Sequence, residues 1–299
     1  MHRAAFFSFL YLNLLSRALA SLMTSTASPP PMNLIEACSK AASDTWERVA
    51  RRFPFRQGQR VLSLDEVIGV GERYLAVLDD DAAWEHIAEE KGVTVHRLRQ
   101  GKVAFAETDD KRWQCLKSTA VLPCDTTWVA NLLLDSSAAV RYNRLSAGRK
   151  DVEEVDKQTK IVWNKSKLSA AVAKVIKPFD SCSMMHAYER PRSPQRGLPH
   201  GNDVVLLTRH VEHPAAPVST TFGRCESIIG LQVLRPAPPS GPSTGKKNKG
   251  STMIVNVNHM RYPHPPYFVN KQIKRATLNY LQGLLAYCSG AEAQSQQKY

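Results

Sequence analysis

The chain has 299 residues, enough for one large domain or two small ones, and an apolar fraction of 43%, which argues against disorder along its whole length. Its 40 Lys and Arg residues exceed its 27 Asp and Glu residues, so the formal net charge is +13. This charge favours anionic partners such as nucleic acid or acidic lipid headgroups.

The motifs narrow the classes of partner and of activity that the composition allows. The basic residues form short, separate groups without RNP-like or zinc-finger spacing, so we expect no nucleic-acid partner. Six cysteines occur without a CxxC pair, and we expect buried thiols rather than a disulfide framework. No HExxH, GxSxG or Cys/His signature is present, so we predict no catalytic residues, no metal site and no cofactor.

The first 20 residues have the layout of a secretory signal. Arg3 precedes an apolar run from 4 to 15, and Ala18-Leu19-Ala20 provides a small-x-small site for cleavage before Ser21. An organelle transit peptide and an uncleaved membrane anchor are alternatives. The compartment therefore stays open between the secretory pathway or ER, a plastid or mitochondrion, and a cytoplasmic membrane contact.

Residues 21–70 are predicted to form a linker and an N-terminal helical arm. Three consecutive prolines at 29–31 favour an extended course, and residues 33–52 follow a loosely amphipathic helical pattern that ends before Pro54. We expect the folded domain to span 71–288.

The first part of this domain is predicted to be a helix around Trp84 that ends at Gly92. The segments 93–99, 101–107 and 113–122 then read as strands. Asp125 is a plausible N-cap for a following helix, or two short ones, with Trp128 on its apolar side.

The remainder is predicted to be rich in strands. Six candidates cover residues 150–156, 159–166, 175–188, 203–211, 225–234 and 252–260. A long amphipathic helix follows up to Cys288, with an apolar stripe that includes Ile273, Tyr280 and Leu284, and 289–299 forms a polar tail. This order predicts an α+β domain with an antiparallel sheet and the last helix lying on it.

Five stretches of this domain are informative in their order and spacing: "AAWEHIAEEKGVTVHR", "WVANLLLDSSAAVRYNRL", "DVEEVDKQTKIVWNKSK", "VEHPAAPVSTTFGRCESIIGLQVLRP" and "MIVNVNHMRYPHPPYFVNKQIKRATLNYLQGL". With them, the chain from about Gly71 to Cys288 resembles the StAR-related lipid-transfer (START) family. It implies a helix-grip fold, a curved antiparallel sheet wrapped around a long C-terminal helix. In one departure, "KPFDSCSMM" has Cys182-Ser183 where the family commonly has the Arg-Asp of "PRDF".

The resemblance also implies a function. One lipid (a sterol, phospholipid or sphingolipid) would be held in an apolar tunnel by a monomer that transfers or senses it. The loop 210–223 and the C-terminal helix would form its gate. The alternative is a helix-grip enzyme, cyclase-like or hydrolase-like, acting on a hydrophobic small molecule.

Candidate site residues follow from the pattern and the resemblance together. The candidates for the tunnel and its lid are Trp128, Met184, Arg224, Met253, Val255, Val257, Phe268, Ile273, Tyr280, Leu281 and Leu284. Arg224 is expected to support structure more often than to touch ligand. Asn256 and Asn258 share the other face of the last strand, which we interpret as a solvated outer face or a headgroup anchor. Lys271, Lys274 and Arg275 are candidates for transient docking on an anionic membrane.

Overall fold

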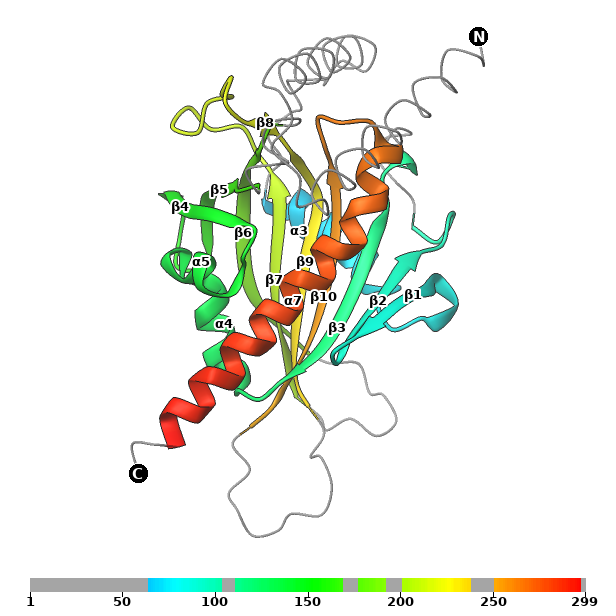
Figure 1. Ribbon diagram of the computed structural model, residues 1–299, viewed down its shortest axis with the longest axis vertical. Coiled ribbons are helices and arrows are strands. Elements are labelled where there is room, and N and C mark those ends of the chain that lie inside the picture. The colour runs from blue at the N-terminus through cyan, green and yellow to red at the C-terminus, as the bar shows by residue number, and fades with distance from the viewer. Residues whose placement is uncertain (1–63, 104–110, 169–176, 192–200, 238–249, 297–299) are drawn as a thin grey trace, which may run out of the picture. The chain divides into compact units, whose positions relative to one another are not determined.

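The computed structural model describes residues 64–296 except for 104–110, 169–176, 192–200 and 238–249 (Figure 1). All described elements belong to the compact unit Val49–Tyr299. The predictions for residues 1–63, and for most of the strand at 101–107, lie outside the described residues. Among the described helices, none combines the length and the apolar character needed to span a membrane.

The described chain alternates short helices with strands and closes on one long helix. Its elements are α3 (Leu64–Leu75), η1 (Asp81–Ala83), β1 (Trp84–Glu90), β2 (Val93–Leu98), β3 (Cys115–Leu122), α4 (Thr126–Leu134), η3 (Ser136–Ala138), α5 (Ala139–Tyr142), β4 (Ser146–Glu154), β5 (Thr159–Ser166), β6 (Phe179–Pro191), β7 (Asn202–His210), β8 (Gly223–Arg224), β9 (Glu226–Pro236), β10 (Thr252–Arg261) and α7 (Pro266–Gln296). The predicted domain start at Gly71 therefore falls inside α3, and α7 continues into the predicted tail.

One sheet joins all the strands in the order β1-β2-β3-β10-β9-β7-β6-β5-β4, with the short β8 pairing parallel to β6. Every other pairing is antiparallel. Figure 1 shows α7 running obliquely across one face of this sheet, while α3 lies behind the other. The predicted fold class, an antiparallel sheet around a C-terminal helix, is confirmed.

The predicted helix around Trp84 was wrong. Residues Trp84–Glu90 form β1, which pairs with β2 across the two-residue turn Lys91-Gly92. Both turn residues have positive φ, 52° and 73°, as a type I′ hairpin requires. A glycine that fits a helix C-cap fits this turn equally well. A register shift between His86 and Ala88 also breaks the alternation that would have marked a strand.

Other predictions of elements are confirmed. The six later strands are β4, β5, β6, β7, β9 and β10, and the segment after Asp125 is the helical pair α4 and α5 joined by η3. Asp125 caps α4, because its side chain accepts a hydrogen bond from the Trp128 amide at 2.9 Å. Four of the five described cysteines are buried thiols, and Cys124 is half-buried.

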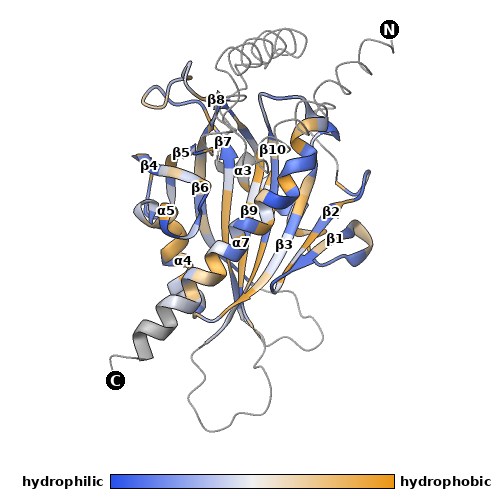
Figure 2. Cartoon of the chain, in the orientation of Figure 1, coloured by the Kyte–Doolittle hydropathy of each residue, from blue (hydrophilic) through white to orange (hydrophobic). Residues whose placement is uncertain are grey.

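Each face of the sheet has its own apolar core. The α7-side core joins β2, β3, β7, β9 and β10 to α4, α5 and α7; its largest buried members include Leu116, Leu206, Leu234, Ile254, Leu281 and Leu284. The α3-side core joins the opposite side chains of the same strands to α3 and Trp84; its members include Leu78, Leu207, Ile229, Leu231 and Val257. Figure 2 shows the matching apolar stretches on the central strands.

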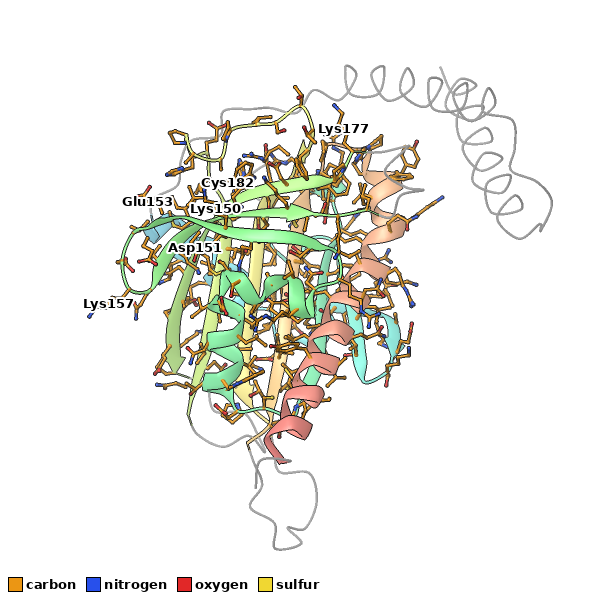
Figure 3. All side chains as sticks on the ribbon, turned by 60° about the vertical axis from the view of Figure 1, so that its left-hand side comes forward. Lys150, Asp151, Glu153, Lys157, Lys177 and Cys182 are labelled. Carbon is orange, nitrogen blue, oxygen red and sulfur yellow. The ribbon has the colours of Figure 1, made fainter. Side chains whose placement is uncertain are left out.

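The two edges of the sheet carry charge. Lys150, Glu153 and Lys157 belong to the β4–β5 hairpin, and Figure 3 shows them along that edge. Lys150 and Glu153 are exposed, as is Glu89 on β1 at the opposite edge. Charged side chains on edge strands discourage pairing with a second sheet.

Candidate functional site

The candidate site is the sheet face that α7 covers. The C-terminal half of α7 packs closely on α5, because a Cβ built on Gly283 would lie 2.2 Å from the Tyr142 carbonyl oxygen. Such contact leaves no room for any side chain at this position. Gly283 therefore sets the distance between α7 and the α4–α5 segment.

The other side of α7 is tied to the β1–β2 hairpin and to the segment before β3. Arg275 Nη1 lies 2.6 Å from Glu90 Oε2, and Gln282 Nε2 donates to the Glu90 carbonyl oxygen at 3.3 Å. Asn270 accepts a hydrogen bond from the Gln114 amide at 3.2 Å and donates to the Arg112 carbonyl oxygen at 3.1 Å. The sheet edge and α7 thus hold each other in place.

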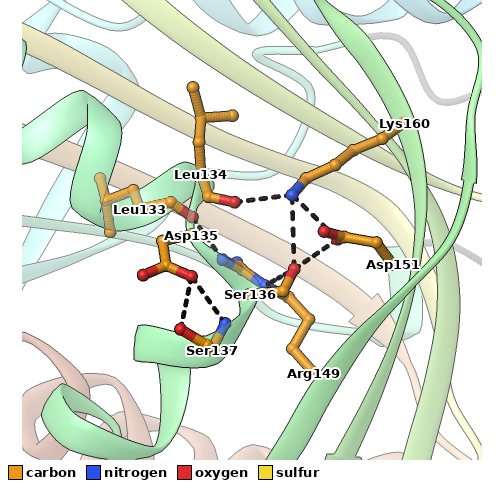
Figure 4. A network of polar contacts seen from close by, with 8 residues as sticks. All are labelled: Leu133, Leu134, Asp135, Ser136, Ser137, Arg149, Asp151 and Lys160. Atoms are coloured by element: carbon orange, nitrogen blue, oxygen red, sulfur yellow. Dashed lines mark hydrogen bonds and ion pairs between the residues drawn. The ribbon is translucent and has the colours of Figure 1, made fainter.

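A polar network fixes the α4–η3 segment on β4 and β5 (Figure 4). Arg149 Nη2 donates to the Leu133 carbonyl oxygen, and Lys160 Nζ donates to that of Leu134, both at 2.6 Å. These are carbonyls of the last turn of α4, where cations are favoured. Lys160 also pairs with Asp151 at 2.9 Å, and Ser136 donates to the same carboxylate. The α4–α5 segment, which carries Tyr142, is therefore fixed on β4 and β5.

Gln232 and Tyr280 connect the sheet to α7 at the centre of this face. Gln232 Nε2 donates to the Tyr280 hydroxyl oxygen at 2.6 Å, and the Tyr142 ring meets the Tyr280 ring edge-on, 6.1 Å away. Burial raises the pKa of both tyrosines above the usual value, so both hydroxyls keep their protons. The Tyr280 hydroxyl accepts from Gln232 and retains its own O–H for a further partner.

Other polar residues surround this pair. Asn256 lies between Ser118 of β3 and Gln232 of β9 in the strand register, and it is 8% exposed. Its Nδ2 donates to Ser118 Oγ at 3.3 Å. Two residues further along β10, Asn258 faces the same way. The interpretation of this face of β10 as a solvated outer face was wrong: it carries Ile254 of the α7-side core and lies under α7.

The sequence-predicted site residues divide between the two faces. Five belong to the α7-side core or pack against it: Trp128, Ile273, Tyr280, Leu281 and Leu284. Phe268 packs against a small cluster at the start of α7 that contains Trp113, Ile228 and Val269. The structure brings these six to the side of the sheet that α7 covers.

Four predicted residues lie elsewhere. Val255 and Val257 belong to the α3-side core, and Met184 and Met253 pack against it. They face α3, so their prediction as a wall of the space under α7 does not match their placement. The reason is that the more apolar face of β10 serves ordinary core packing.

Arg224 is a structural residue, as expected. Its guanidinium forms two hydrogen bonds to the Asp180 carboxylate, at 2.9 and 3.1 Å, and its Nη2 also donates to the carbonyl oxygens of Ala216 and Pro217. Glu226, two residues further on, pairs with Arg261 at 2.8 Å. Sequence reasoning missed Asp180. When "PRDF" is aligned on Pro178, its aspartate is retained as Asp180, while Phe179 and Ser181 replace its arginine and phenylalanine. Placing the departure at Cys182-Ser183 was therefore wrong.

The predicted gate loop meets the bend before α7. Arg224 holds the middle of the loop, and Val211 and Ala216 are buried against Cys182. At its end, a Cβ built on Gly223 would lie 2.6 Å from Pro263 Cγ, so loop and bend are in contact. The Phe179 ring packs beside this contact, 5.6 Å from the Tyr262 ring.

Two histidines lie near this end of the sheet. Burial lowers the pKa of His210 to about 4, and it does the same for His264 in the bend. Both are therefore neutral near pH 7. The structure describes no group of three or more His, Cys, Asp and Glu residues that could hold a metal ion.

The three cations proposed for membrane docking lie on the exposed side of α7. Arg275 forms an ion pair with Glu90, and this pair would compete with the predicted contact between Arg275 and a membrane. Two apolar side chains are exposed at the gate end: Val218 in the loop is 52% exposed and Tyr267 in the first turn of α7 is 50% exposed.

Comparison with solved structures identifies the fold. The human StAR-related lipid transfer protein 5 superposes with a TM-score of 0.60 at 16% identity, over 76% of this chain and 97% of that one. Human STARD10 superposes with a TM-score of 0.57 at 15% identity, over 81% of this chain and 86% of that one. The lipid transfer and protein localization domain of human StarD13 superposes with a TM-score of 0.53 at 15% identity, over 76% of this chain and 98% of that one. No protein-family model matches the sequence, and no curated protein matches it significantly. The chain thus has the START-like helix-grip fold.

Proposed function

We propose that this protein binds one lipid between the sheet and α7 and transfers or senses it without chemical change. The observation that carries the proposal is the composition of the face under α7. It combines the apolar α7-side core with the polar group of Gln232, Asn256 and Tyr280. Lipid sites need both parts, because apolar walls contribute about 25 cal/mol per Å² of buried surface and a few polar groups orient the ligand.

Entry and exit would occur at the gate end, between the loop 210–223 and the first turns of α7. Val218 and Tyr267 expose apolar surface there, and Lys271 and Lys274 follow on the exposed side of α7. Apolar groups beside cations favour transient contact with an anionic membrane. The prolines at 214, 217, 265 and 266 stiffen both segments, so we expect α7 and the loop to move as units.

The test is lipid capture by the full chain. Native mass spectrometry with solvent extraction should find a co-purified lipid at one-to-one stoichiometry, and the protein should move a fluorescent lipid between vesicles. A protein that carries no lipid and takes none from vesicles of any composition would contradict the proposal and favour a helix-grip enzyme.

A further inference from the structure

The polar residues under α7 form a continuous belt, which we define as Ser118, Thr208, Gln232, Asn256, Asn258 and Tyr280. The strand register places the first five on adjacent strands. Ser118, Asn256 and Gln232 form one row, and Asn258 and Thr208 lie in the next, on either side of Gly230. Tyr280 reaches the first row from α7. The belt crosses β3, β10, β9 and β7 at the same level.

Parts of the belt have unused hydrogen-bonding capacity. The Asn258 side chain makes no hydrogen bond to any residue that the structure describes, and Gln232 uses only its Nε2. An amide carries two donors and an acceptor, and Tyr280 retains its O–H. Gln232, Asn258 and Tyr280 also keep partial exposure under α7. These groups are therefore available to a polar ligand group, which would satisfy them when a bound ligand excludes water from this face.

On this face, charged side chains of the described residues are held by partners within the protein. Arg149 and Lys160 bind the last carbonyls of α4, and Glu226 pairs with Arg261. The nearby His210 is neutral near pH 7, because burial lowers its pKa to about 4, and its Nδ1 is buried without a hydrogen-bond partner. A buried phosphate needs a cation or several charge-assisted donors. The belt instead offers neutral amides and hydroxyls.

We infer that the protein selects an uncharged lipid whose head carries hydroxyl or amide groups, and that the belt binds this head. The inference rests on the proposed function and narrows its cargo. Asn258, Gln232 and the Tyr280 hydroxyl bind the head by hydrogen bonds, and the hydrocarbon contacts the α7-side core. A phosphate head would lose its hydration at the belt without gaining a counter-charge.

The test compares lipids that differ only in the head. A ceramide and a diacylglycerol are matched with phosphatidic acid and phosphatidylcholine that carry the same fluorescent acyl chain, and each is titrated into the full-length protein. We expect the uncharged lipids to bind at least about tenfold more tightly, the effect of one buried hydrogen bond worth about 1.4 kcal/mol. Equal or tighter binding of the phospholipids would overturn the inference while leaving lipid carriage intact.

Variants of the belt residues test whether the lipid head binds there. Asn258→Leu and Gln232→Leu should each weaken binding of the uncharged lipids about tenfold and leave phospholipid binding unchanged, whereas Asn258→Ser should retain more binding than Asn258→Leu. Asn202→Leu is the matched control, since Asn202 is exposed and its side chain donates to Glu189 at 2.9 Å. Wild-type affinity in both Leu variants would overturn the inference if circular dichroism shows them folded. Failure to bind any lipid would refute the proposed function itself and the inference with it.

Discussion

The same strands form both faces of the sheet, but the two faces differ in composition. Toward α3, β10 presents Met253, Val255 and Val257 to a core of apolar side chains. Toward α7, the same strand presents Ile254, then Asn256 and Asn258. The more apolar face is thus the structural one. The proposed lipid site on the α7 side combines apolar walls with a few polar groups, which is the usual composition of a ligand pocket.

The difference predicts separate effects on stability and on lipid uptake. Substitutions in the α3-side core, or in the buried Arg224–Asp180 pair, should lower the free energy of unfolding and leave lipid preference unchanged in the molecules that fold. Changes in the belt should alter lipid preference and leave the free energy of unfolding nearly unchanged. The following tests proceed from the largest expected effect to the smallest.

Arg224→Ala should be the most damaging substitution. It leaves the Asp180 carboxylate, which is 2% exposed, without its cation, and loss of one partner of a buried pair costs about 3–5 kcal/mol. Urea unfolding measures the loss. Arg97→Ala is the control, because its pair with Glu85 is exposed at the sheet edge and should cost at most about 1 kcal/mol. A stable Arg224→Ala protein would show that this pair does not support the loop.

Leu231→Ala should lower the free energy of unfolding by about 2–5 kcal/mol, because it opens a cavity in the α3-side core, where Leu231 is fully buried. Lipid affinity, measured at a temperature where the variant is folded, should equal that of the wild type. A clear loss of affinity would show that the two faces are coupled, against the separation argued above.

Gly283→Ala should cost about 1–3 kcal/mol, because the added methyl group meets the Tyr142 carbonyl oxygen and must push α7 away from α5. Thermal unfolding and lipid exchange rates measure the two consequences, and exchange should become faster. Gly69→Ala is the control, since nothing lies within 4 Å of its added Cβ. Slower exchange in Gly283→Ala would contradict a lid role for α7.

Acid should produce the most gradual effect, at most about 1.4 kcal/mol per pH unit for one histidine. The pKa of His210 is about 4 in the folded chain, against about 6.5 when unfolded. Between these values the unfolded chain binds a proton that the folded chain does not, so the free energy of unfolding should fall as pH drops from 6.5 to 4. His210→Gln should make this slope shallower in urea titrations. An unchanged slope would mean that the pKa of His210 is the same in the folded and the unfolded protein.

Sequence patterns correctly predicted the elements whose apolar residues recur with a regular period. The later strands alternate, and the stripe of Ile273, Tyr280 and Leu284 predicted the helix that covers the sheet. The β1–β2 hairpin was mistaken for a helix, because a bulge interrupts its alternation and Gly92 suits both structures. Local signals could not distinguish them.

The candidate site was harder to predict than the fold. Alternation shows that Val255 and Asn256 face opposite ways, but only the packing of the helices decides which of the two faces is covered by α7 and which by α3. Gln232 gave no signal of its own within an apolar strand; its contact with Tyr280 joins residues 48 positions apart. Asp180 could have been found from the spacing to Pro178.

The most direct measurement is photo-crosslinking of the full-length protein with a ceramide that carries a diazirine on its acyl chain, followed by mass spectrometry that locates each adduct. The account predicts adducts on α7 and on residues of the α7-side core, such as Leu281 and Ile254, with none on α3. Adducts confined to α3 and its core, or to exposed surface alone, would contradict the claim that the lipid lies between the sheet and α7.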